Sequence, residues 1–296
     1  MINYIFKNTN NSIAFYALKA ARQLKISGAS FRIIFDKEYD IFLQDNLVCD
    51  SFYTNSDRHI FDSFILKDNN VLLDFDLDFS ISGFSCYEDY ILFKLFDEEK
   101  NLDSLNISTK IDQKITVEQI LQDNNRNNFS YVLFAPYNLD VDFNQIYTHN
   151  DLYYDASLRS FYTEHVEKIC SYLTSKVNLI TVLPSSNSIN LNELSYLVQK
   201  SHFVISTLDI AHVLAVEYNK PCFVNLGRFT GYKPKNENVT IFDPERNNKK
   251  IIPSSFFAKD FETSLEYNNK ILEYDVDLLQ KEIINSLDKN QIAYQS

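Results

Sequence analysis

Short apolar runs alternate with amphipathic stretches along the first part of the chain. Residues 2–6 and 31–35 are apolar runs of strand length. Between them, Asn10, Asn11 and Ser12 offer a helix N-cap, and Gly28 supplies a stop signal. The intervening apolar residues recur at helical spacing, at Ile13, Ala17, Ala20, Ala21 and Leu24. This strand–helix–strand order predicts a parallel sheet.

The next hundred residues are less regular. Residues 71–75 form another strand-like run, and residues 116–123 have a helical pattern. Residues 90–96 are apolar throughout, so their period does not separate helix from strand. A polar stretch at 122–128 has few core-forming residues, and we therefore expect a first domain of residues 1–127.

The alternation restarts after this stretch and continues to the end of the chain. We expect strands at 131–134, 177–183, 203–205, 221–226 and 240–242, and helices at 156–174, 191–200 and 210–218. They predict a second α/β domain, residues 128–275. A terminal segment, 276–296, contains a helix at 278–287. One placement of this helix is against the first domain. Ligands of such sheets bind at the carboxyl ends of the strands, and two domains leave a cleft between them.

Composition and charge narrow the classes of protein. Apolar residues make up 45% of the 296 residues and charged residues 23%, as in globular proteins. No apolar run approaches the roughly 20 residues that span a bilayer, and we expect no signal peptide. Twenty-eight basic against forty acidic residues give a net charge of −12, which disfavours nucleic-acid binding.

Cysteine and glycine usage excludes several familiar sites. The four cysteines lie far apart and form no CxxC pair, so we expect neither structural zinc nor disulfides, and a reducing cytoplasm. The four glycines cannot build a GxGxxG or P-loop motif. A nucleotide, if bound, must be held by other means.

Residues 191–234 carry the most specific pattern. A helix leads to a strand, a polar turn, a second helix, the triplet Asn219-Lys220-Pro221, and a strand that ends at Gly227. This order resembles the donor-binding half of GT-B glycosyltransferases, especially the heptosyltransferase-like family. The resemblance implies two Rossmann-like parallel-sheet domains facing a cleft, with an acceptor-binding first domain and a nucleotide-sugar-binding second domain. It also implies a metal-independent enzyme with the nucleotide-sugar as co-substrate and no other cofactor.

The sequence departs from that family at two points. The family's turn carries an aspartate that falls here near Thr207 or Leu208, and His212 lies nine residues before Pro221, one more than expected. The family's first loop usually presents a catalytic aspartate, whereas residues 7–12 contain no carboxylate. An asparagine there cannot act as a general base near neutral pH.

The donor site is expected at the carboxyl edge of the second sheet. A helix N-terminus preceded by hydroxyl residues offers backbone N–H groups and a positive dipole end to a phosphate. The candidate donor-binding residues are Pro136, Tyr137, Ser185, Ser186, Ser206, Thr207, Asp209, His212, Arg228 and Lys233. Asp209 is equally explained as a helix N-cap, and His212 as a structural histidine. For the remaining serines the alternative to ligand binding is ordinary helix capping, and for the remaining cations it is a solvated surface position.

Candidate catalytic carboxylates follow a strand in the first domain. Residues 74–78 read Asp-Phe-Asp-Leu-Asp, and strand alternation would place their carboxylates on one face. We expect the catalytic base to be Asp76, Asp78 or His212, and we expect no metal. The alternative for the two aspartates is a solvated strand end. Asn10, Asn11 and Ser12 are the candidate acceptor-binding residues.

One charge pattern suggests a partner. Residues 1–35 contain five basic residues and no acidic residue, and Lys19, Arg22 and Lys25 follow one another on the polar side of the predicted helix. This stripe fits an anionic membrane surface or an acidic acceptor, and a solvated helix face is the plain alternative. The 24 phenylalanines and 19 tyrosines leave room for a homodimer.

Three functions remain open from the sequence. By resemblance, the first is a glycosyltransferase of bacterial surface polysaccharide or lipopolysaccharide synthesis, which works in the cytoplasm and at the inner face of the membrane. A sialyl- or Kdo-type transferase that uses a CMP-sugar is a variant of it. The second is another enzyme of this architecture, such as an epimerase or pyruvyl transferase. The third is a catalytically silent homologue that acts as a binding partner.

Overall fold

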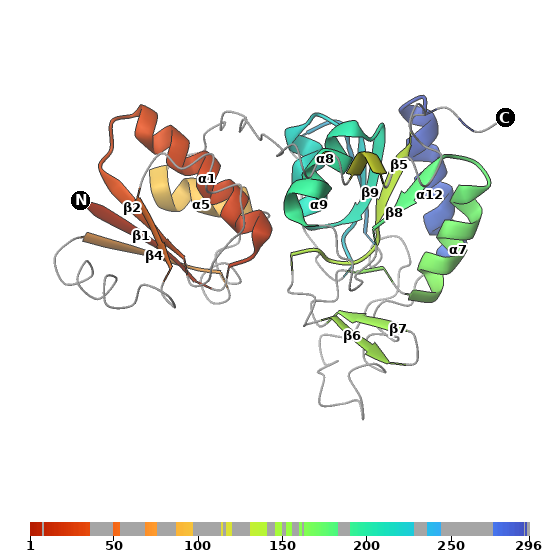
Figure 1. Cartoon of the computed structure of the whole chain (residues 1–296), viewed down its shortest axis with the longest axis horizontal. Helices are drawn as coiled ribbons and strands as arrows, with labels where there is room; N and C mark the ends of the chain where they lie inside the picture. The colour runs from red at the N-terminus through yellow and green to blue at the C-terminus, as the bar shows by residue number, and fades with distance from the viewer. Residues whose placement is uncertain are drawn as a thin grey trace. The chain divides into compact units, whose positions relative to one another are not determined.

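The computed structural model divides into two compact units, Met1–Ser108 and Thr109–Ser296 (Figure 1). The predicted boundary after residue 127 lies outside the described residues. The structure describes residues 1–7, 9–35, 50–53, 69–75, 87–96, 114, 117–119, 131–140, 146–149, 152–155, 160–161, 163–182, 190–227, 236–243, 275–292 and 294.

The first unit contains a four-stranded parallel sheet in the order β3-β2-β1-β4. Its strands are β1 (Ile2–Lys7), β2 (Phe31–Phe35), β3 (Asp50–Tyr53) and β4 (Asn69–Asp74). Two helices accompany them, α1 (Asn11–Ile26) and α5 (Tyr87–Phe96), and these helices pack against each other. The predicted strands of this unit are confirmed, and β3 is an additional edge strand.

Helix α1 begins and ends where its sequence predicts. The side chain of Asn10 accepts a hydrogen bond of 2.9 Å from the backbone N–H of Ile13, which caps the first turn. All five apolar residues predicted for one face are buried. Gly28 has a φ of +80°, a left-handed conformation that glycine adopts without steric cost just after a helix.

Helix α5 resolves the ambiguity of residues 90–96. Tyr90, Ile91 and Leu92 are buried together, and the strand alternative is therefore excluded for this segment. The ring of Phe75, which follows β4, contacts Tyr87 and Tyr90 with centroid distances of 5.8 and 5.2 Å. Helix α5 thus starts at the carboxyl end of the sheet, as α1 does.

The second unit contains a five-stranded parallel sheet in the order β11-β10-β9-β5-β8. Its strands are β5 (Val132–Ala135), β8 (Leu179–Thr181), β9 (Phe203–Thr207), β10 (Cys222–Asn225) and β11 (Val239–Phe242). Its helices are α7 (Thr163–Thr174), α8 (Leu191–Lys200), α9 (Ile210–Glu217) and α12 (Val276–Lys289). Helices α7 and α12 pack against each other, and so do α8 and α9.

Helix α12 completes the core of the second unit. Leu279, Ile283 and Leu287 are fully buried in the same apolar cluster as Phe203 and Phe223 of the sheet. The apolar face that the sequence analysis offered to the first domain is therefore used within the second unit.

Two segments between β5 and β8 differ from the sequence analysis. A two-stranded antiparallel sheet, β6 (Ile146–His149) and β7 (Leu152–Asp155), was not predicted. The helix expected from residue 156 is α7, which begins at Thr163. Residues 160 and 161 are not helical, because Phe161 donates a backbone hydrogen bond of 2.8 Å to the carbonyl of Pro136 instead. Among the described residues, no helix is long and apolar enough to cross a bilayer.

Candidate functional site

In the second sheet, the direction in which the chain crosses from strand to strand reverses at one point on the carboxyl edge. From β5, the chain crosses to β8 on one side and then to β9 on the other. Open parallel sheets bind ligands where the direction of crossing reverses, because two successive loops diverge there. The loop of residues 136–140, which follows β5, and the turn between β9 and α9 both arrive at this point.

Buried polar side chains gather at the same edge. The loop after β5, the first turns of α7, α8 and α9, and the ends of β9 and β10 contribute them. The set comprises Asn138, Asp140, Ser160, His165, Asn192, Ser206, Thr207, Asp209, His212 and Asn225. Since unpaired polar groups are costly to bury, such a gathering is typical of a functional site or a tightly bonded network.

Asp209 accepts three backbone hydrogen bonds at this edge. It is the N-cap of α9, and its Oδ1 atom accepts hydrogen bonds from the backbone N–H groups of Ala211 at 3.0 Å and His212 at 3.4 Å. Its Oδ2 atom accepts a third, at 3.0 Å, from the backbone N–H of Leu139. The capping interpretation is therefore confirmed. Two N–H groups that the sequence analysis offered to a phosphate are used by Asp209 itself.

The environment of Asp209 favours its neutral form. Burial raises the pKa of Asp209 to about 8, and the nearby carboxylate of Asp140 adds to the rise. Hydrogen bonds from the backbone of Leu139 and His212, and the Thr207 hydroxyl, act in the opposite direction. Near pH 7 the protonated form of Asp209 is thus strongly populated, and this edge carries less negative charge than its two carboxyl groups suggest.

His212 lies in the first turn of α9 with 2% of its surface exposed. Burial lowers the pKa of His212 to about 4, so the imidazole is neutral at pH 7. A neutral imidazole has one donor and one acceptor nitrogen. His212 can therefore offer a hydrogen bond to a ligand without bringing a positive charge.

The loop after β5 is fixed by hydrogen bonds on both sides. The backbone N–H of Asn138 donates to Ser160 Oγ at 2.9 Å, and its side chain accepts from the N–H of Asp140 at 3.0 Å. Pro136 and Tyr137, both predicted donor residues, are buried in this loop. The sequence analysis missed Asp140 and His165, although the position of Asp140 in the loop that follows a strand was a usable signal.

The hydroxyl residues at the end of β9 lie on opposite faces of the sheet. Thr207 is aligned with Asn225 of β10, so alternation places both on the same face, and both are fully buried. The Ser206 hydroxyl donates a hydrogen bond of 3.0 Å to the backbone carbonyl of the next residue, Thr207. The Ser206 hydroxyl is thus already used within the chain.

The first sheet has an equivalent point between β1 and β4. The backbone N–H of Phe75 donates to the carbonyl of Lys7 at 3.2 Å, so the segments that follow both strands begin side by side. Ser12 is buried there, and Asn10 uses its side chain as the cap of α1. Asp74, half-buried, ends β4, and Phe75 is already in a turn. Strand β4 thus ends at Asp74, the first of the three aspartates that a longer strand would place on one face.

Six predicted site residues lie outside the described residues. They are Asp76, Asp78, Ser185, Ser186, Arg228 and Lys233. In the part of the chain that the structure describes, no group of three His, Cys, Asp or Glu side chains could hold a metal ion.

Comparison by sequence finds no relative: no family model matches the chain, and no curated protein matches it. Comparison by structure finds several solved proteins. The ADP-heptose lipopolysaccharide heptosyltransferase II of E. coli aligns with a TM-score of 0.57 at 9% identity, over 98% of this chain and 100% of that one. A family 9 glycosyl transferase from Veillonella parvula aligns with a TM-score of 0.56 at 8% identity, over 97% and 96%.

A third structure extends the same similarity. TibC, an iron-containing dodecameric glycosyltransferase of enterotoxigenic E. coli, aligns with a TM-score of 0.50 at 11% identity, over 98% of this chain and 76% of that one. At such low identity these alignments establish the fold. The predicted fold class, two α/β domains with parallel sheets as in heptosyltransferases, is confirmed.

Proposed function

We propose that this protein is a glycosyltransferase that moves a sugar from a nucleotide-sugar donor to a glycan or glycolipid of the bacterial surface. The observation that carries the proposal is the alignment of the whole chain, both sheets included, with enzymes of this class. The buried polar edge of the second sheet supports it, because it lies where parallel sheets bind nucleotides. Fold alone does not fix the activity, so the site must be tested directly.

The donor would bind at the reversal point of the second sheet. The neutral imidazole of His212 would donate a hydrogen bond to a phosphate oxygen, and Thr207 would add a hydroxyl. Asp209 would act as a positioning residue, because it joins the first turn of α9 to the loop after β5. Ser185, Ser186, Arg228 and Lys233 are the proposed source of further phosphate contacts and of positive charge.

The acceptor would bind to the first unit, near the segments that follow β1 and β4. The acceptor hydroxyl oxygen would attack the anomeric carbon while the bond from that carbon to the donor phosphate breaks. Asp76 or Asp78 would take the hydroxyl proton, as a general base. The leaving phosphate would remain at the second sheet, where the Thr207 hydroxyl and the His212 imidazole would donate the hydrogen bonds that stabilise its charge.

The nucleotide base of the sugar donor is proposed from the solved structures that align with this chain. One aligned structure is an ADP-heptose enzyme, and another, the E. coli heptosyltransferase WaaC with ADP, aligns with a TM-score of 0.50 at 10% identity, over 98% and 99%. An ADP-sugar is therefore the first donor to test. A CMP-sugar is the variant, since nothing in the described edge selects the base.

A catalytically silent binding protein is the second candidate. Two observations favour it specifically. The loop after β1 contains no carboxylate, and Asn10 uses its side chain to cap α1. Asp209 also uses the N–H groups of Ala211 and His212 that a donor phosphate would otherwise bind.

A nucleotide panel separates these candidates. Thermal unfolding is measured with ADP, UDP, GDP, TDP and CMP, with EDTA and with Mg²⁺. A ligand at 100 times its Kd stabilises the fold by about 2.7 kcal/mol, which shifts the melting temperature measurably. A hit that persists in EDTA supports the transferase, and slow release of free nucleotide from the matching nucleotide-sugar demonstrates turnover. Binding without turnover on any acceptor supports the silent homologue.

A further inference from the structure

Helix α8 begins at the carboxyl edge of the second sheet, where the buried polar side chains gather. Its first turn has a complete capping box. The side chain of Asn190 accepts the backbone N–H of Glu193 at 3.0 Å, and the carboxylate of Glu193 accepts the backbone N–H of Asn190 at 2.9 Å. Such a box satisfies two of the backbone donors at the start of a helix.

Two other backbone donors of this turn are left over. The N–H of Leu194 donates to the carbonyl of Asn190 at 2.9 Å, which is the first bond inside the helix. The N–H groups of Leu191 and Asn192 precede it, so no carbonyl within the helix can accept them. In the part of the chain that the structure describes, they meet no other acceptor. Leu191 is only half-buried, so the turn is open to its surroundings.

The side chain of Asn192 adds a third donor. It is 1% exposed, and among the described residues its amide nitrogen Nδ2 has no hydrogen-bond partner. Helical side chains lean toward the N-terminus of their helix, so an amide at the second position lies over the start of α8, beside the N–H groups of Leu191 and Asn192. An amide that is buried without a partner costs free energy, and most buried polar groups avoid that cost.

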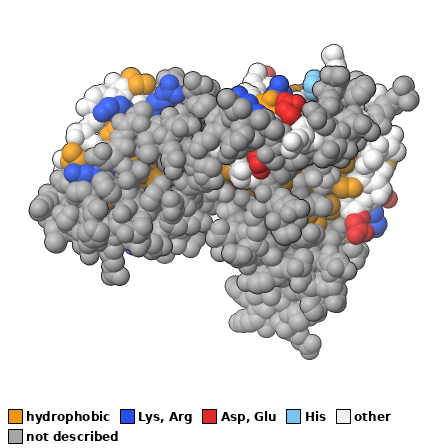
Figure 2. All heavy atoms as spheres, in the orientation of Figure 1, with side chains coloured by type: hydrophobic (Ala, Val, Ile, Leu, Met, Phe, Trp, Pro, Cys, Tyr) orange, Lys and Arg blue, Asp and Glu red, His pale blue; other side chains and the backbone are white. Residues whose placement is uncertain are grey.

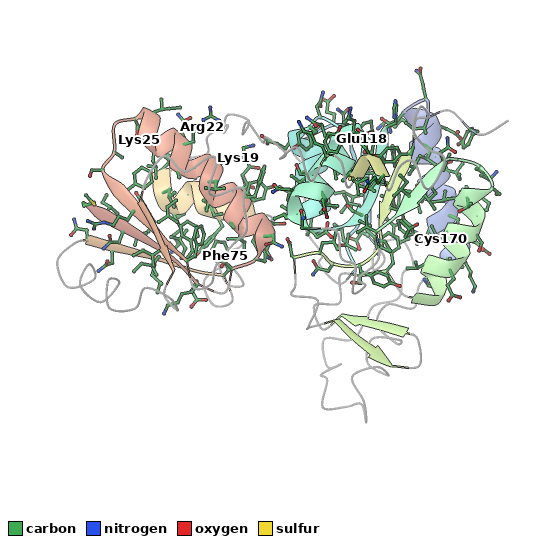
Figure 3. All side chains as sticks on the ribbon, viewed as in Figure 1. Lys19, Arg22, Lys25, Phe75, Glu118 and Cys170 are labelled. Carbon is green, nitrogen blue, oxygen red and sulfur yellow. The ribbon has the colours of Figure 1, made fainter. Side chains whose placement is uncertain are left out.

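The next polar residues on the same face of α8 are bonded. The hydroxyl of Ser195 lies 2.6 Å from the hydroxyl of Tyr218, at the end of α9. Tyr196 donates a hydrogen bond of 2.7 Å to the carboxylate of Glu118, which lies beside α8 in Figure 3. The missing partner of Asn192 is therefore particular to the start of the helix, at the edge where the proposed donor binds.

The charges around this turn favour an uncharged ligand group. The carboxylate of Glu193 already lies at the positive end of the helix, so a second anion there would be repelled. The described side chains that are visible on this unit mix acidic and basic groups and gather no charge of one sign (Figure 2). Three hydrogen-bond donors beside a carboxylate suit a hydroxyl or carbonyl oxygen, which accepts hydrogen bonds and carries no charge.

We propose that the amide of Asn192, with the N–H groups of Leu191 and Asn192, binds an uncharged oxygen of the nucleotide-sugar donor, and that Asn192 is a specificity-determining residue. The inference rests on the proposed function and adds to it the group that the start of α8 recognises. The phosphates of a nucleotide-sugar are charged, whereas its nucleoside and its sugar both offer hydroxyl or carbonyl oxygens. These two parts are also what distinguishes one donor from another.

Calorimetric titration of the full chain tests the proposal. The probes are ADP, UDP, GDP and TDP with their glucose esters, and CMP with CMP-sialic acid. For a probe that binds through this oxygen, Asn192→Leu and Asn192→Ala are expected to raise the Kd about fivefold, the loss of one hydrogen bond between neutral groups. If a nucleotide and its ester both lose affinity, the oxygen belongs to the nucleoside. If only the ester does, the oxygen belongs to the sugar.

The free protein gives a second readout that needs no ligand. Leucine has the branched shape of asparagine without its polar atoms, so Asn192→Leu removes the unpaired amide and is expected to raise the urea midpoint of unfolding. Leucine is also the better helix former, and Asn285→Leu, at an exposed position of α12, measures that contribution alone. Ser195→Ala removes a bonded hydroxyl of the same helix. It is expected to lower the midpoint and to leave every Kd unchanged.

Three results would overturn the proposal. The first is an Asn192→Leu midpoint that rises no more than that of Asn285→Leu, because the amide would then be satisfied in the free protein. The second is a bound probe whose Kd is the same for the parent and for both Asn192 variants. The third is a parent that binds none of the probes, nor adenosine, uridine or glucose at millimolar concentration. A parent that binds one of these three uncharged compounds but no nucleotide contradicts the proposed function alone, provided that Asn192→Ala weakens that binding.

Discussion

The Oδ2 atom of Asp209 accepts a hydrogen bond of 3.0 Å from the backbone N–H of Leu139. This bond joins the start of α9 to the loop after β5, the two segments that meet at the reversal point of the second sheet. Asp209 is therefore both the cap of α9 and a connection between α9 and the loop after β5.

Asp209→Ala should destabilise the second unit more than the loss of an ordinary cap. Removing an N-cap costs about 1 kcal/mol, and a buried N–H left without an acceptor costs about 1–3 kcal/mol more. We therefore expect a loss of about 2–4 kcal/mol in the free energy of unfolding, measured by urea denaturation at pH 6.5.

Asp275→Ala provides the matched control. Asp275 is an exposed N-cap of α12 whose side chain also accepts from two backbone N–H groups, at 3.0 and 3.2 Å. It makes no connection to another loop in the described residues, so we expect a loss of about 1 kcal/mol. Equal losses in the two variants would show that the bond to Leu139 contributes nothing.

The stability of the protein should fall between about pH 6.5 and pH 8. Asp209 has a folded pKa of about 8, raised from 3.8, so the folded state holds a proton that the unfolded state has lost over that range. His212 has a folded pKa of about 4, lowered from 6.5, and contributes the opposite slope only below pH 6.5. The slope approaches about 1.4 kcal/mol per pH unit between these two pH values and is about half of that at each of them, so the loss by pH 8 is about 1 kcal/mol.

Asp209→Asn isolates this contribution, because asparagine still caps the helix but does not titrate. The free energy of unfolding of this variant should be nearly constant from pH 6.5 to pH 8, as measured by chemical denaturation at several pH values. Asp275→Asn should keep the slope of the parent. A parent slope that persists in Asp209→Asn would place its origin in another group.

The terminal helix should be essential for the fold of the second unit. Ile283 is fully buried in the core cluster, so Ile283→Ala should cost about 2–5 kcal/mol of unfolding free energy. Leu278 is half-buried at the edge of that cluster, and Leu278→Ala should cost clearly less. Similar losses for the two variants, or none for Ile283→Ala, would contradict the packing described for α12.

Much of the fold could be predicted from the sequence because its signals are local. Residues 2–35 contain a cap, an apolar stripe, a stop and two strands in unambiguous order, and the structure follows them. Residues 191–226 do the same for α8, β9, α9 and β10. In each case the period of the apolar residues matches the element that buries them.

The elements that were missed depend on distant partners. Strand β3 starts with Asp50 and Ser51, and it is a strand because it pairs with β2. The start of α7 is delayed because Phe161 and Ser160 form hydrogen bonds with Pro136 and Asn138 of the loop after β5, which lie 25 and 22 residues earlier in the sequence. Neither partner can be recognised from the local pattern.

The sequence predicted where the site residues lie, but it did not predict their protonation states. Thr207, Asp209 and His212 were expected at the carboxyl edge of the sheet, and they lie there. The neutral state of His212 and the raised pKa of Asp209 follow from burial and from Asp140, which comes from a loop 69 residues away in the sequence. Such long-range neighbours decide protonation, and the sequence alone does not show them.

A nucleotide titration by calorimetry tests the central proposal most directly. The best nucleotide of the panel is titrated into the parent, His212→Ala and His202→Ala, each checked for folding by circular dichroism. His202 is exposed at the opposite, amino end of β9 and serves as the control. We predict equal Kd values for the parent and His202→Ala and a Kd at least about tenfold higher for His212→Ala, the loss of one hydrogen bond to a charged group. A parent that binds no nucleotide, or a His212→Ala variant with an unchanged Kd, would contradict the proposed donor site.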